Sequence, residues 1–241
     1  MNCIIFKSSE MRLEPGDPKL EHIVKFLKTP EGGEIFAGTA NGDLHVCTIS
    51  YLPNGGAVLT SKREANNPRR LEAGVGVSFA RPQIAQRLLF EAACFGVRNL
   101  VFYPPTKGEA GYAKSSLYTS GEYEKWLERG AEQACATHIP HFEYADSLEG
   151  AIARLDELGD PNPVNLAPDV YEAETSFADA FNTYNPTKED YTNVILGSER
   201  GFTNADRDLL RAHNYTLVSL GERVLRTDTA LIACLSLLAN I

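Results

Sequence analysis

From residue 74 onward, the chain alternates between short apolar, strand-like runs and longer segments with helical periodicity. The run at 192–197, for example, precedes a helix-like segment in which Thr203 and Asp206 have nearly the spacing of a capping box. Strands that alternate with helices in this way form a parallel sheet with helices on its faces. The sequence therefore predicts an α/β domain over residues 74–241. Strands are expected at 75–80, 99–104, 141–145, 164–168, 192–197 and 216–221, and helices at 82–96, 121–136, 147–159, 175–184, 203–214 and 228–240.

The first 73 residues have a different pattern. Short β-branched or alternating runs are interrupted by glycine, proline and asparagine, and Asn41-Gly42 is a hairpin signal. One helix is expected at 19–28, where apolar residues recur at helical spacing. Many short strands with one helix favour a small β-barrel. The polar stretch 61–70 is interpreted as a linker or as the last edge of the barrel.

Composition excludes several classes of protein. No apolar run approaches the roughly 18–20 residues of a membrane span. The five cysteines are scattered and form no CxxC pair, which is typical of reduced thiols in a cytoplasmic protein. The histidines and cysteines lack the spacing of a zinc site, so no metal is expected.

The net charge of −9 is unevenly distributed. Residues 142–192 hold twelve acidic residues against two basic ones, Arg154 and Lys188, so this segment carries −10 and the rest of the chain +1. The charge therefore excludes only a protein that binds any nucleic acid through a uniformly basic surface. The acidic segment is predicted to be a solvated surface that faces away from the ligand loops, except where residues 166–168 enter the site.

Three strand ends carry small or apolar residues where most enzymes display catalytic groups. They lie at 164–168, 194–202 and 217–227. Ligands of parallel α/β sheets bind beyond the carboxyl ends of the strands, and glycines there let backbone groups reach the ligand. An adenine or ribose held by backbone groups and aliphatic walls would need little more.

Two segments near the C-terminus resemble a known family. GSERGFTNADRDLL followed by LVSLGERVLRTDTALIACLSLL is similar to the C-terminal region of the RsmE family, SPOUT-superfamily methyltransferases that methylate uridine N3 in small-subunit ribosomal RNA. Leu166-Ala167-Pro168 resembles the family's leucine-histidine-proline loop, without the histidine. Glu132-Gln133 before Ile139-Pro140 resembles a helix end of the family, and His22-Ile-Val-Lys25 resembles its barrel segment.

This resemblance implies a fold and a cofactor. The implied fold is a SPOUT-type parallel sheet with a C-terminal trefoil knot at 74–241, preceded by a PUA-like RNA-binding β-barrel at 1–73. The implied methyl donor is S-adenosylmethionine, and the implied assembly is a homodimer that acts on ribosomal RNA or the small ribosomal subunit. Transferred by motif, the cofactor-binding residues are Leu166, Ala167, Pro168, Leu196, Gly197, Ser198, Gly201, Leu220, Gly221, Val224, Leu225 and Thr229.

The chain departs from the family pattern mainly on the substrate side. Glu91 stands where the family has a lysine, and Ala136 where it has a basic residue. Within the motifs, Ser198 replaces a proline, Arg200 a glycine and Asp228 a glutamate. The cofactor loops thus match the family pattern more closely than the substrate-side positions do, so the resemblance specifies the methyl donor more closely than the target nucleotide.

Uridine N3 carries a proton, so its methylation needs a base, or cations that stabilise the uracil anion. We hypothesise that Arg226, and with it Arg223, stabilises the anion, while Glu199 accepts the proton or positions the cofactor. A phosphate or dimer contact for Arg226 and a helix cap for Glu199 are the alternatives. RNA phosphates are expected to contact basic residues of the barrel, the linker and the first turn of the α/β domain: Lys25, Lys28, Lys62, Arg63, Arg69, Arg70 and Arg81.

Two other functions remain open at this point. One is a SPOUT methyltransferase that acts on another RNA site. The other is a non-catalytic RNA-binding or ribosome-assembly factor that keeps the fold. Glu91 and Ala136 favour this second reading, and the retained LGERVLRT segment opposes it.

Overall fold

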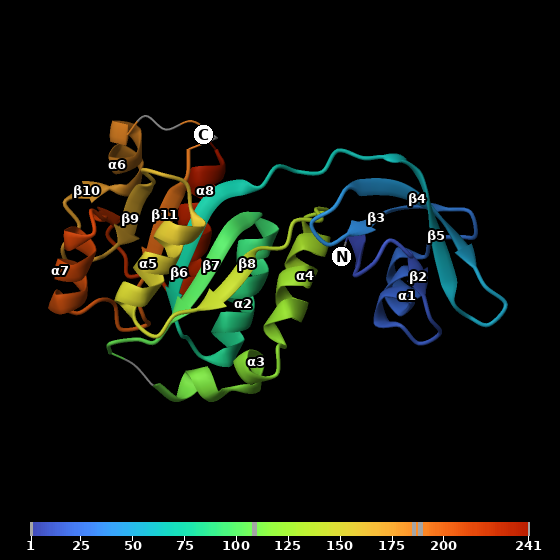
Figure 1. Ribbon diagram of the computed structural model, residues 1–241, viewed down its shortest axis with the longest axis horizontal. Helices are drawn as coiled ribbons and strands as arrows, with labels where there is room; N and C mark the ends of the chain where they lie inside the picture. The colour runs from blue at the N-terminus through green and yellow to red at the C-terminus, as the bar shows by residue number, and fades with distance from the viewer. Residues whose placement is uncertain (1, 108–109, 185–186, 188–189, 241) are drawn as a thin grey trace. The chain divides into compact units, whose positions relative to one another are not determined.

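The computed structural model describes residues 2–107, 110–184, 187 and 190–240 (Figure 1). The chain forms two compact units, and both are discontinuous in sequence. Unit 1 comprises Met1–Arg69 and Glu128–Ile139, and unit 2 comprises Arg70–Leu127 and Pro140–Ile241.

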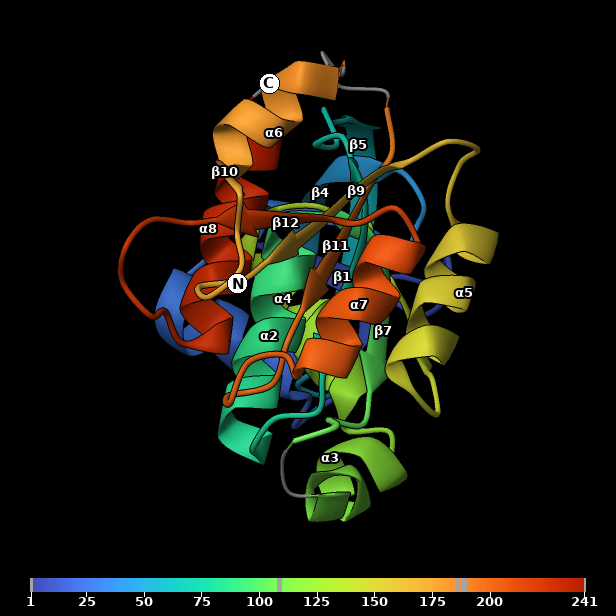
Figure 2. The same ribbon diagram turned by 90° about the vertical axis from the view of Figure 1, so that its left-hand side faces the viewer.

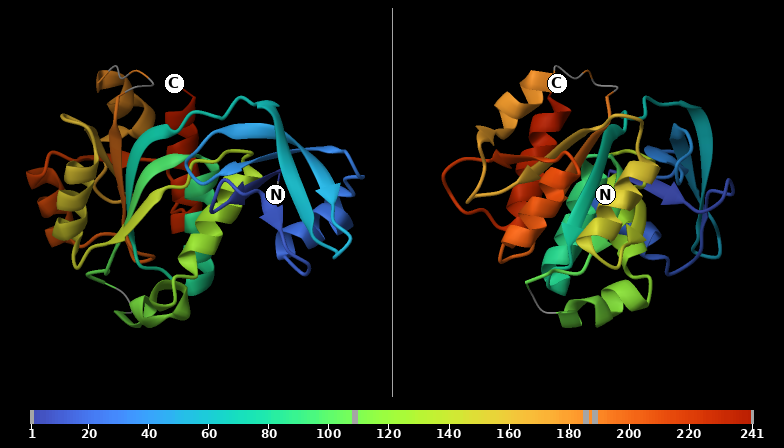
Figure 3. Two further views of the ribbon diagram at one scale, coloured as in Figure 1. Left: turned by 45° about the vertical axis from the view of Figure 1, so that its right-hand side comes forward. Right: turned by 60° about the vertical axis from the view of Figure 1, so that its left-hand side comes forward.

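Unit 1 is built on a curled five-stranded sheet (Figure 3). The strand order is β1-β3-β4-β5-β2, and all neighbours are antiparallel except β1 and β3. Ile4, Ile49 and Leu59 pack in its core with Leu20 and Ile23 of the helical segment. The strands are β1 (Cys3–Phe6), β2 (Arg12–Leu13), β3 (Glu34–Thr39), β4 (Leu44–Tyr51) and β5 (Ala57–Glu64).

The helix expected at 19–28 forms as two short turns. α1 (Pro18–His22) begins at Asp17, whose side chain caps the backbone N–H of Lys19, and η1 (Ile23–Leu27) continues as a π-helical turn. Lys28 ends the segment in the left-handed region at φ 52°. The segment is therefore shorter and less regular than its periodicity predicts.

Unit 2 contains a seven-stranded sheet in which all described pairs are parallel, as the strand–helix alternation predicts. The strand order is β10-β12-β9-β11-β6-β7-β8. The strands are β6 (Leu71–Ser78), β7 (Val97–Tyr103), β8 (His141–Tyr144), β9 (Val164–Pro168), β10 (Thr175–Ser176), β11 (Thr192–Leu196) and β12 (Thr216–Ser219).

Helices cover both faces of this sheet (Figure 2). α5 (Leu148–Leu158) and α7 (Asn204–Ala212) share a core on one face with Val101, Ala167 and Ile195. On the other face, α2 (Pro82–Cys94) packs against α8 (Thr227–Ala239). The remaining helices are η2 (Ala110–Lys114), α3 (Ser116–Thr119), α4 (Tyr123–Gln133) and α6 (Phe177–Tyr184).

Two details differ from the sequence prediction. The parallel sheet begins before residue 74, since Leu71 pairs with Val97 and Ala73 with Thr192. The second half of α4 and the residues after it belong to unit 1, although the sequence places them inside the α/β domain. Within unit 1, buried Glu132 of α4 accepts the backbone N–H of Ile5 in β1, which fixes this segment to the first sheet.

Side-chain caps that can be identified in the sequence mark the first residues of α7 and α5. Thr203 and Asp206 form a reciprocal capping box at α7, and the Ser147 hydroxyl accepts the backbone N–H of Gly150 at α5. Within the described residues, no helix is both long and apolar enough to cross a bilayer.

Candidate functional site

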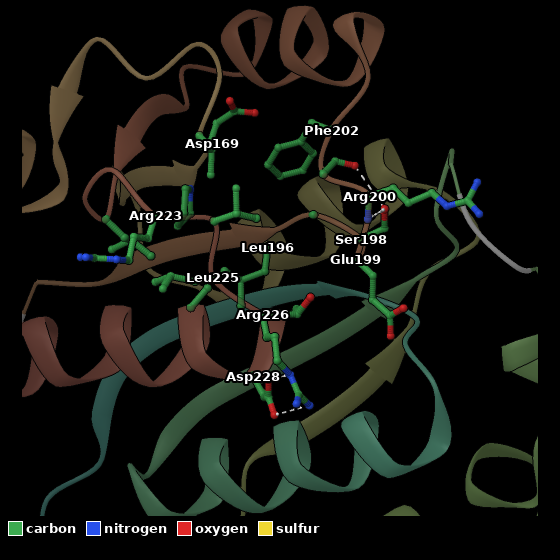
Figure 4. Close-up of a pocket in the computed structure, with 18 of the residues that line it drawn as sticks. Asp169, Leu196, Ser198, Glu199, Arg200, Phe202, Arg223, Leu225, Arg226 and Asp228 are labelled. Atoms are coloured by element: carbon green, nitrogen blue, oxygen red, sulfur yellow. Dashed lines mark hydrogen bonds and ion pairs between the residues drawn. The ribbon is translucent and has the colours of Figure 1, made fainter.

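Unit 2 contains a cavity of about 580 Å³ at the carboxyl ends of three adjacent strands. β12, β9 and β11 are neighbours in the sheet, so the loops that follow them meet at one edge. The lining comes from residues 168–171 at the end of β9, from 196–202 at the end of β11, and from 220–221, 223–228 and 230 after β12, with Arg81 and Ile84 at the start of α2 (Figure 4).

The loop after β11 is a tight turn closed by its own hydrogen bonds. The backbone N–H of Gly201 donates to the Ser198 carbonyl at 2.8 Å, and the Arg200 N–H donates to the Ser198 hydroxyl at 3.2 Å. Gly201 has φ 70°, a conformation that disfavours side chains, and a Cβ on Gly197 would crowd Phe202 at 3.3 Å. The glycines therefore bring backbone, and not side chains, to the cavity wall.

The loop after β12 carries the arginine that the sequence singles out. Gly221 has φ 108° with open space around it, so it is required for its backbone conformation rather than by crowding. At the end of the loop, the Arg226 guanidinium contacts both carboxylate oxygens of Asp228 at 3.2 Å (Figure 4). Arg87 of α2 contacts the same carboxylate at 3.3 Å. Asp228 thus holds the Arg226 side chain at the cavity.

Two further acidic groups lie near these cations. Glu199 is 3.7 Å from Arg81, whose Nε also donates to the Tyr112 hydroxyl at 3.2 Å. Burial raises the pKa of Glu91 in α2, and the negative charge of Asp228 raises it further. Glu91 replaces the lysine of the family pattern, so this edge of the site carries less positive charge than the pattern would give it.

The loop after β9 is fixed by a buried ion pair. One carboxylate oxygen of Asp169 accepts the backbone N–H groups of Tyr171 and Glu172 at 2.5 and 2.8 Å. The other accepts Nε of Arg207 in α7 at 2.8 Å. Both charged side chains are buried. The pair therefore ties the cavity loop to a helix of the α/β core.

Most of the residues singled out by sequence line this cavity. They are Pro168, Leu196, Gly197, Ser198, Glu199, Gly201, Leu220, Gly221, Arg223, Val224, Leu225, Arg226 and Arg81, the last of which was expected to contact RNA phosphates.

Leu166, Ala167 and Thr229 do not line the cavity, which corrects their placement. Leu166 and Ala167 are fully buried within β9, where Ala167 packs into the core shared with α5 and α7. Thr229 lies in the first turn of α8 and is exposed. Pro168 is thus the part of this triplet that reaches the site.

Several lining residues were not among the candidate site residues, although Arg200, Phe202 and Thr227 lie in strand ends that the sequence marks as ligand-binding. Three of them directly follow the strand expected at 164–168, namely Asp169, Val170 and Tyr171. This position is the sequence feature from which they could have been identified. The others are Ile84, Arg200, Phe202, Thr227, Asp228 and Ala230.

The acidic segment lies largely outside the cavity lining. Among the described acids of residues 142–192, Asp169 alone lines the cavity, and its charge is paired with Arg207. Lys188 and Glu189 of this segment lie outside the described residues. Apart from Asp169, the described acids of this segment therefore lie outside the cavity lining.

The other cations proposed for RNA lie on unit 1 or at the start of unit 2. Lys62 and Arg63 both contact Glu34, at 2.6 and 3.6 Å, and these contacts lower the pKa of Glu34. Lys25 contacts Glu21 at 2.8 Å, and Arg70 contacts Glu72 at 3.8 Å. Lys28 is exposed. In the parts of the chain that the structure describes, no group of three or more histidine, cysteine or acidic residues is arranged to hold a metal ion.

Fold and site together define a class: a parallel α/β protein with a ligand cavity of backbone loops at the carboxyl edge of its sheet. Comparison with known proteins narrows this class. A family model described as an RNA methyltransferase domain matches residues 67–239. The chain belongs to this family.

Two relatives of similar length match this chain over nearly its whole length. The ribosomal RNA small subunit methyltransferase E of Treponema pallidum is 28% identical over 252 residues, covering 100% of this chain and 91% of the relative. Methyltransferase E 1 of Borreliella burgdorferi is 25% identical, with 97% and 95% covered. These matches confirm the resemblance to the RsmE family.

Solved structures agree on the fold. The small subunit methyltransferase E of Neisseria gonorrhoeae, solved with S-adenosyl methionine, superposes with a TM-score of 0.76 at 16% identity and covers 98% of this chain and 95% of its own. A methyltransferase from Legionella pneumophila, in complex with the same cofactor, gives 0.77 at 16% identity, with 100% and 97% covered.

Proposed function

We propose that this chain is an S-adenosylmethionine-dependent methyltransferase that modifies N3 of a uridine in small-subunit ribosomal RNA. The observation that carries this proposal is the cavity itself. The turn at 197–202 and the segment at 220–228, which hold the RsmE-like motifs, are brought side by side around one space of about 580 Å³. Motif and geometry therefore point to the same residues.

The lining fits the cofactor. Leu196, Leu220 and Leu225 supply apolar walls for an adenine ring, while Gly197 and Gly221 expose backbone groups to its polar edges. When bound, S-adenosylmethionine supplies a methyl group on a positively charged sulfur. Ser198, Gly201, Val224 and Pro168 complete the set of residues proposed to hold it.

Arg226 and Glu199 are the residues proposed to act on the target base. Removing the N3 proton leaves a negative charge on the uracil ring, and a fixed guanidinium stabilises that charge without reorganising. Arg226 is preorganised by Asp228 while its side chain remains 63% exposed to an incoming base. Glu199, in the turn that follows β11, is proposed to accept the proton. Arg223 lines the same cavity and is proposed to assist Arg226.

RNA affinity is proposed to come from unit 1 and the first residues of unit 2. The curled sheet of unit 1 is consistent with a PUA-like barrel. Lys62 and Arg63 lie on its strand β5, and Lys25 and Lys28 lie on the helical segment of the same unit. Arg69 ends the first segment of unit 1, and Arg70 begins unit 2. Replacing Arg69 and Arg70 together should reduce the slope of log affinity against log salt by about 1–2. An unchanged slope would show that neither residue contacts an RNA phosphate.

Further proposals concern topology and assembly. The segment from β11 through α8 resembles the region that forms the trefoil knot in the RsmE family, and we propose the same threading here. We also propose a homodimer in the cytoplasm, with unit 1, which holds most of residues 1–73, as the RNA-binding part and unit 2, which holds most of residues 74–241, as the methyltransferase part. Sedimentation velocity tests the dimer.

Two measurements on the purified full chain test the function. Calorimetry should show binding of S-adenosylmethionine in a one-to-one ratio with each chain. Small ribosomal subunits from cells that lack the gene should then accept one labelled methyl group each. Cofactor binding without transfer to ribosomal subunits would favour another RNA target, and absence of both would favour a non-catalytic RNA-binding factor.

A further inference from the structure

An exposed aromatic side chain stands at the edge of the cavity. Tyr171 is 74% exposed and lines the cavity beside Val170, which is 47% exposed. Burying an aromatic side chain is worth several times the thermal energy, so a large one left in water at a site indicates a ligand contact. No step assigned so far to the cavity uses this residue.

The backbone that carries Tyr171 is rigidly held. Asp169 accepts the backbone N–H groups of Tyr171 and Glu172 and is itself paired with buried Arg207. Glu172 at the end of the loop contacts Arg207 and Arg211 at 3.4 and 2.8 Å. A side chain on such a loop loses little further freedom on binding, which favours a recognition role.

An arginine side chain also contacts one face of the Tyr171 ring. The Arg207 guanidinium lies 5.6 Å from the ring centroid, in a cation–π arrangement. A Cβ on Gly201 would lie 4.0 Å from Tyr171 Cε2, an ordinary van der Waals distance, so the ring lies next to the turn that follows β11. Because Arg207 is buried and Tyr171 is not, the ring has a supported side and a side open to solvent.

Charge at the rim favours a nucleic-acid occupant. Arg200 and Arg223 line the cavity, are exposed and extend away from its centre on opposite sides (Figure 4). No acidic side chain of the described residues lies within ion-pair distance of either guanidinium. By contrast, each acidic residue of the lining, Glu199, Asp228 and Asp169, contacts an arginine. An exposed aromatic ring in the same lining as two arginines that have no acidic partner among the described residues suits a base flanked by phosphates.

We propose that Tyr171 is a stacking residue for the target base, which lies on the open face of its ring once it is turned out of the RNA stack. This proposal rests on the proposed function, because it names the residue by which the same cavity recognises RNA. Enzymes that modify a base must take it out of its stack, and an aromatic face compensates part of that cost. Tyr171 would therefore act on RNA binding and leave the binding of S-adenosylmethionine unchanged.

Steady-state methyl transfer to small ribosomal subunits tests the proposal. Tyr171→Ala should lower kcat/KM for the subunit at least about tenfold, because stacking of one base supplies that much affinity. Tyr171→Phe, which keeps the ring, should stay within about twofold of wild type, and so should the dissociation constant for S-adenosylmethionine in both variants. Tyr184→Ala is the matched control, since Tyr184 is a 49% exposed tyrosine of the same unit that does not line the cavity.

A fluorescence measurement keeps the test independent of methyl transfer. The chain has one tryptophan, so Tyr171→Trp adds a reporter whose emission should be quenched by single-stranded uridine-containing RNA, while Tyr184→Trp should not respond. If wild type transfers no methyl group but Tyr171→Trp is quenched, the proposed function fails and the stacking stands. Unquenched Tyr171→Trp overturns the proposal. Normal RNA kinetics of Tyr171→Ala also overturn it. If the mass of that variant in sedimentation changes as well, Tyr171 is a contact between subunits.

Discussion

Each unit contains an ion pair with a buried carboxylate, and the two carboxylates differ in how completely their oxygens are hydrogen-bonded. In unit 1, the Lys19 amine contacts Glu128 at 2.6 Å and Glu132 at 3.1 Å, but one oxygen of buried Glu132 has no hydrogen-bond partner among the described residues. In unit 2, both oxygens of Asp169 are used, by Arg207 and by two backbone N–H groups. The first pair joins segments that lie far apart in the chain, whereas the second shapes a loop of the cavity.

This difference separates stability from function. A buried carboxylate with an unused oxygen carries an uncompensated desolvation cost, so its contribution depends on its cation. A fully bonded carboxylate positions the groups around it. We therefore expect changes at Lys19 to act on unfolding alone, and changes around Asp169 to act on ligand binding.

The largest effect is expected from Lys19→Met. Removing the cation leaves Glu132 buried beside Glu128 without compensation, which should lower the free energy of unfolding in urea by about 3–5 kcal/mol. Glu132→Gln is the control. Burial raises the pKa of Glu132, and a neutral amide there can still accept the Ile5 N–H, so its loss should be clearly smaller. Equal losses in both variants would refute this account of the cluster.

The second largest effect is expected from Arg226→Ala. This variant contrasts an exposed arginine of the cavity with the buried Arg207. Because Arg226 is largely exposed, its removal should change the free energy of unfolding by less than about 0.5 kcal/mol. Methyl transfer should fall about 100-fold or more, the usual cost of losing one preorganised charge-stabilising group. Full turnover of Arg226→Ala on the natural RNA would exclude the proposed role.

Asp169→Asn should have a smaller, mixed effect. The amide oxygen can still accept the backbone N–H groups of Tyr171 and Glu172, but Arg207 loses its charged partner and retains Glu172 and Asn204. We expect about 1–2 kcal/mol less stability and about tenfold weaker binding of S-adenosylmethionine in calorimetry. Asp208→Asn, which alters an exposed carboxylate of the same helix, should change neither quantity. If the two variants behave alike, the buried pair does not shape the cavity.

The smallest effect is expected at a partly exposed ion pair, Glu143 with Arg154, against which the two buried carboxylates can be compared. Arg154 and His141 lower the pKa of Glu143 to about 2, well below its ordinary value near 4.5. A carboxyl group with a depressed pKa in the folded state stabilises above its unfolded pKa, and this contribution is lost as the pH falls from about 4.5 toward 2. Glu143→Gln should therefore make the stability of the protein less steeply dependent on pH in that window. If the free energies of unfolding of wild type and Glu143→Gln change in parallel with pH, the ion pair does not contribute to stability in this window.

The comparison also shows what sequence reasoning could reach. Local signals were sufficient for the strand–helix alternation and for the Thr203–Asp206 capping box, because each depends on neighbours within a few residues. The role of Glu132 depends on Lys19, and the loop geometry of Asp169 depends on Arg207, so neither could be read from spacing. Leu166 and Ala167 were misplaced because the resemblance names a loop, whereas the structure continues β9 through Pro168.

The central claim is that the cavity of unit 2 methylates one uridine of small-subunit ribosomal RNA. The most direct test is mass mapping of that RNA from cells that carry the gene, lack it, or carry Arg226→Ala. The account predicts that one methyluridine, modified at N3, is present in the first cells and absent or strongly reduced in the other two. An identical pattern of methylated nucleotides in all three would contradict it.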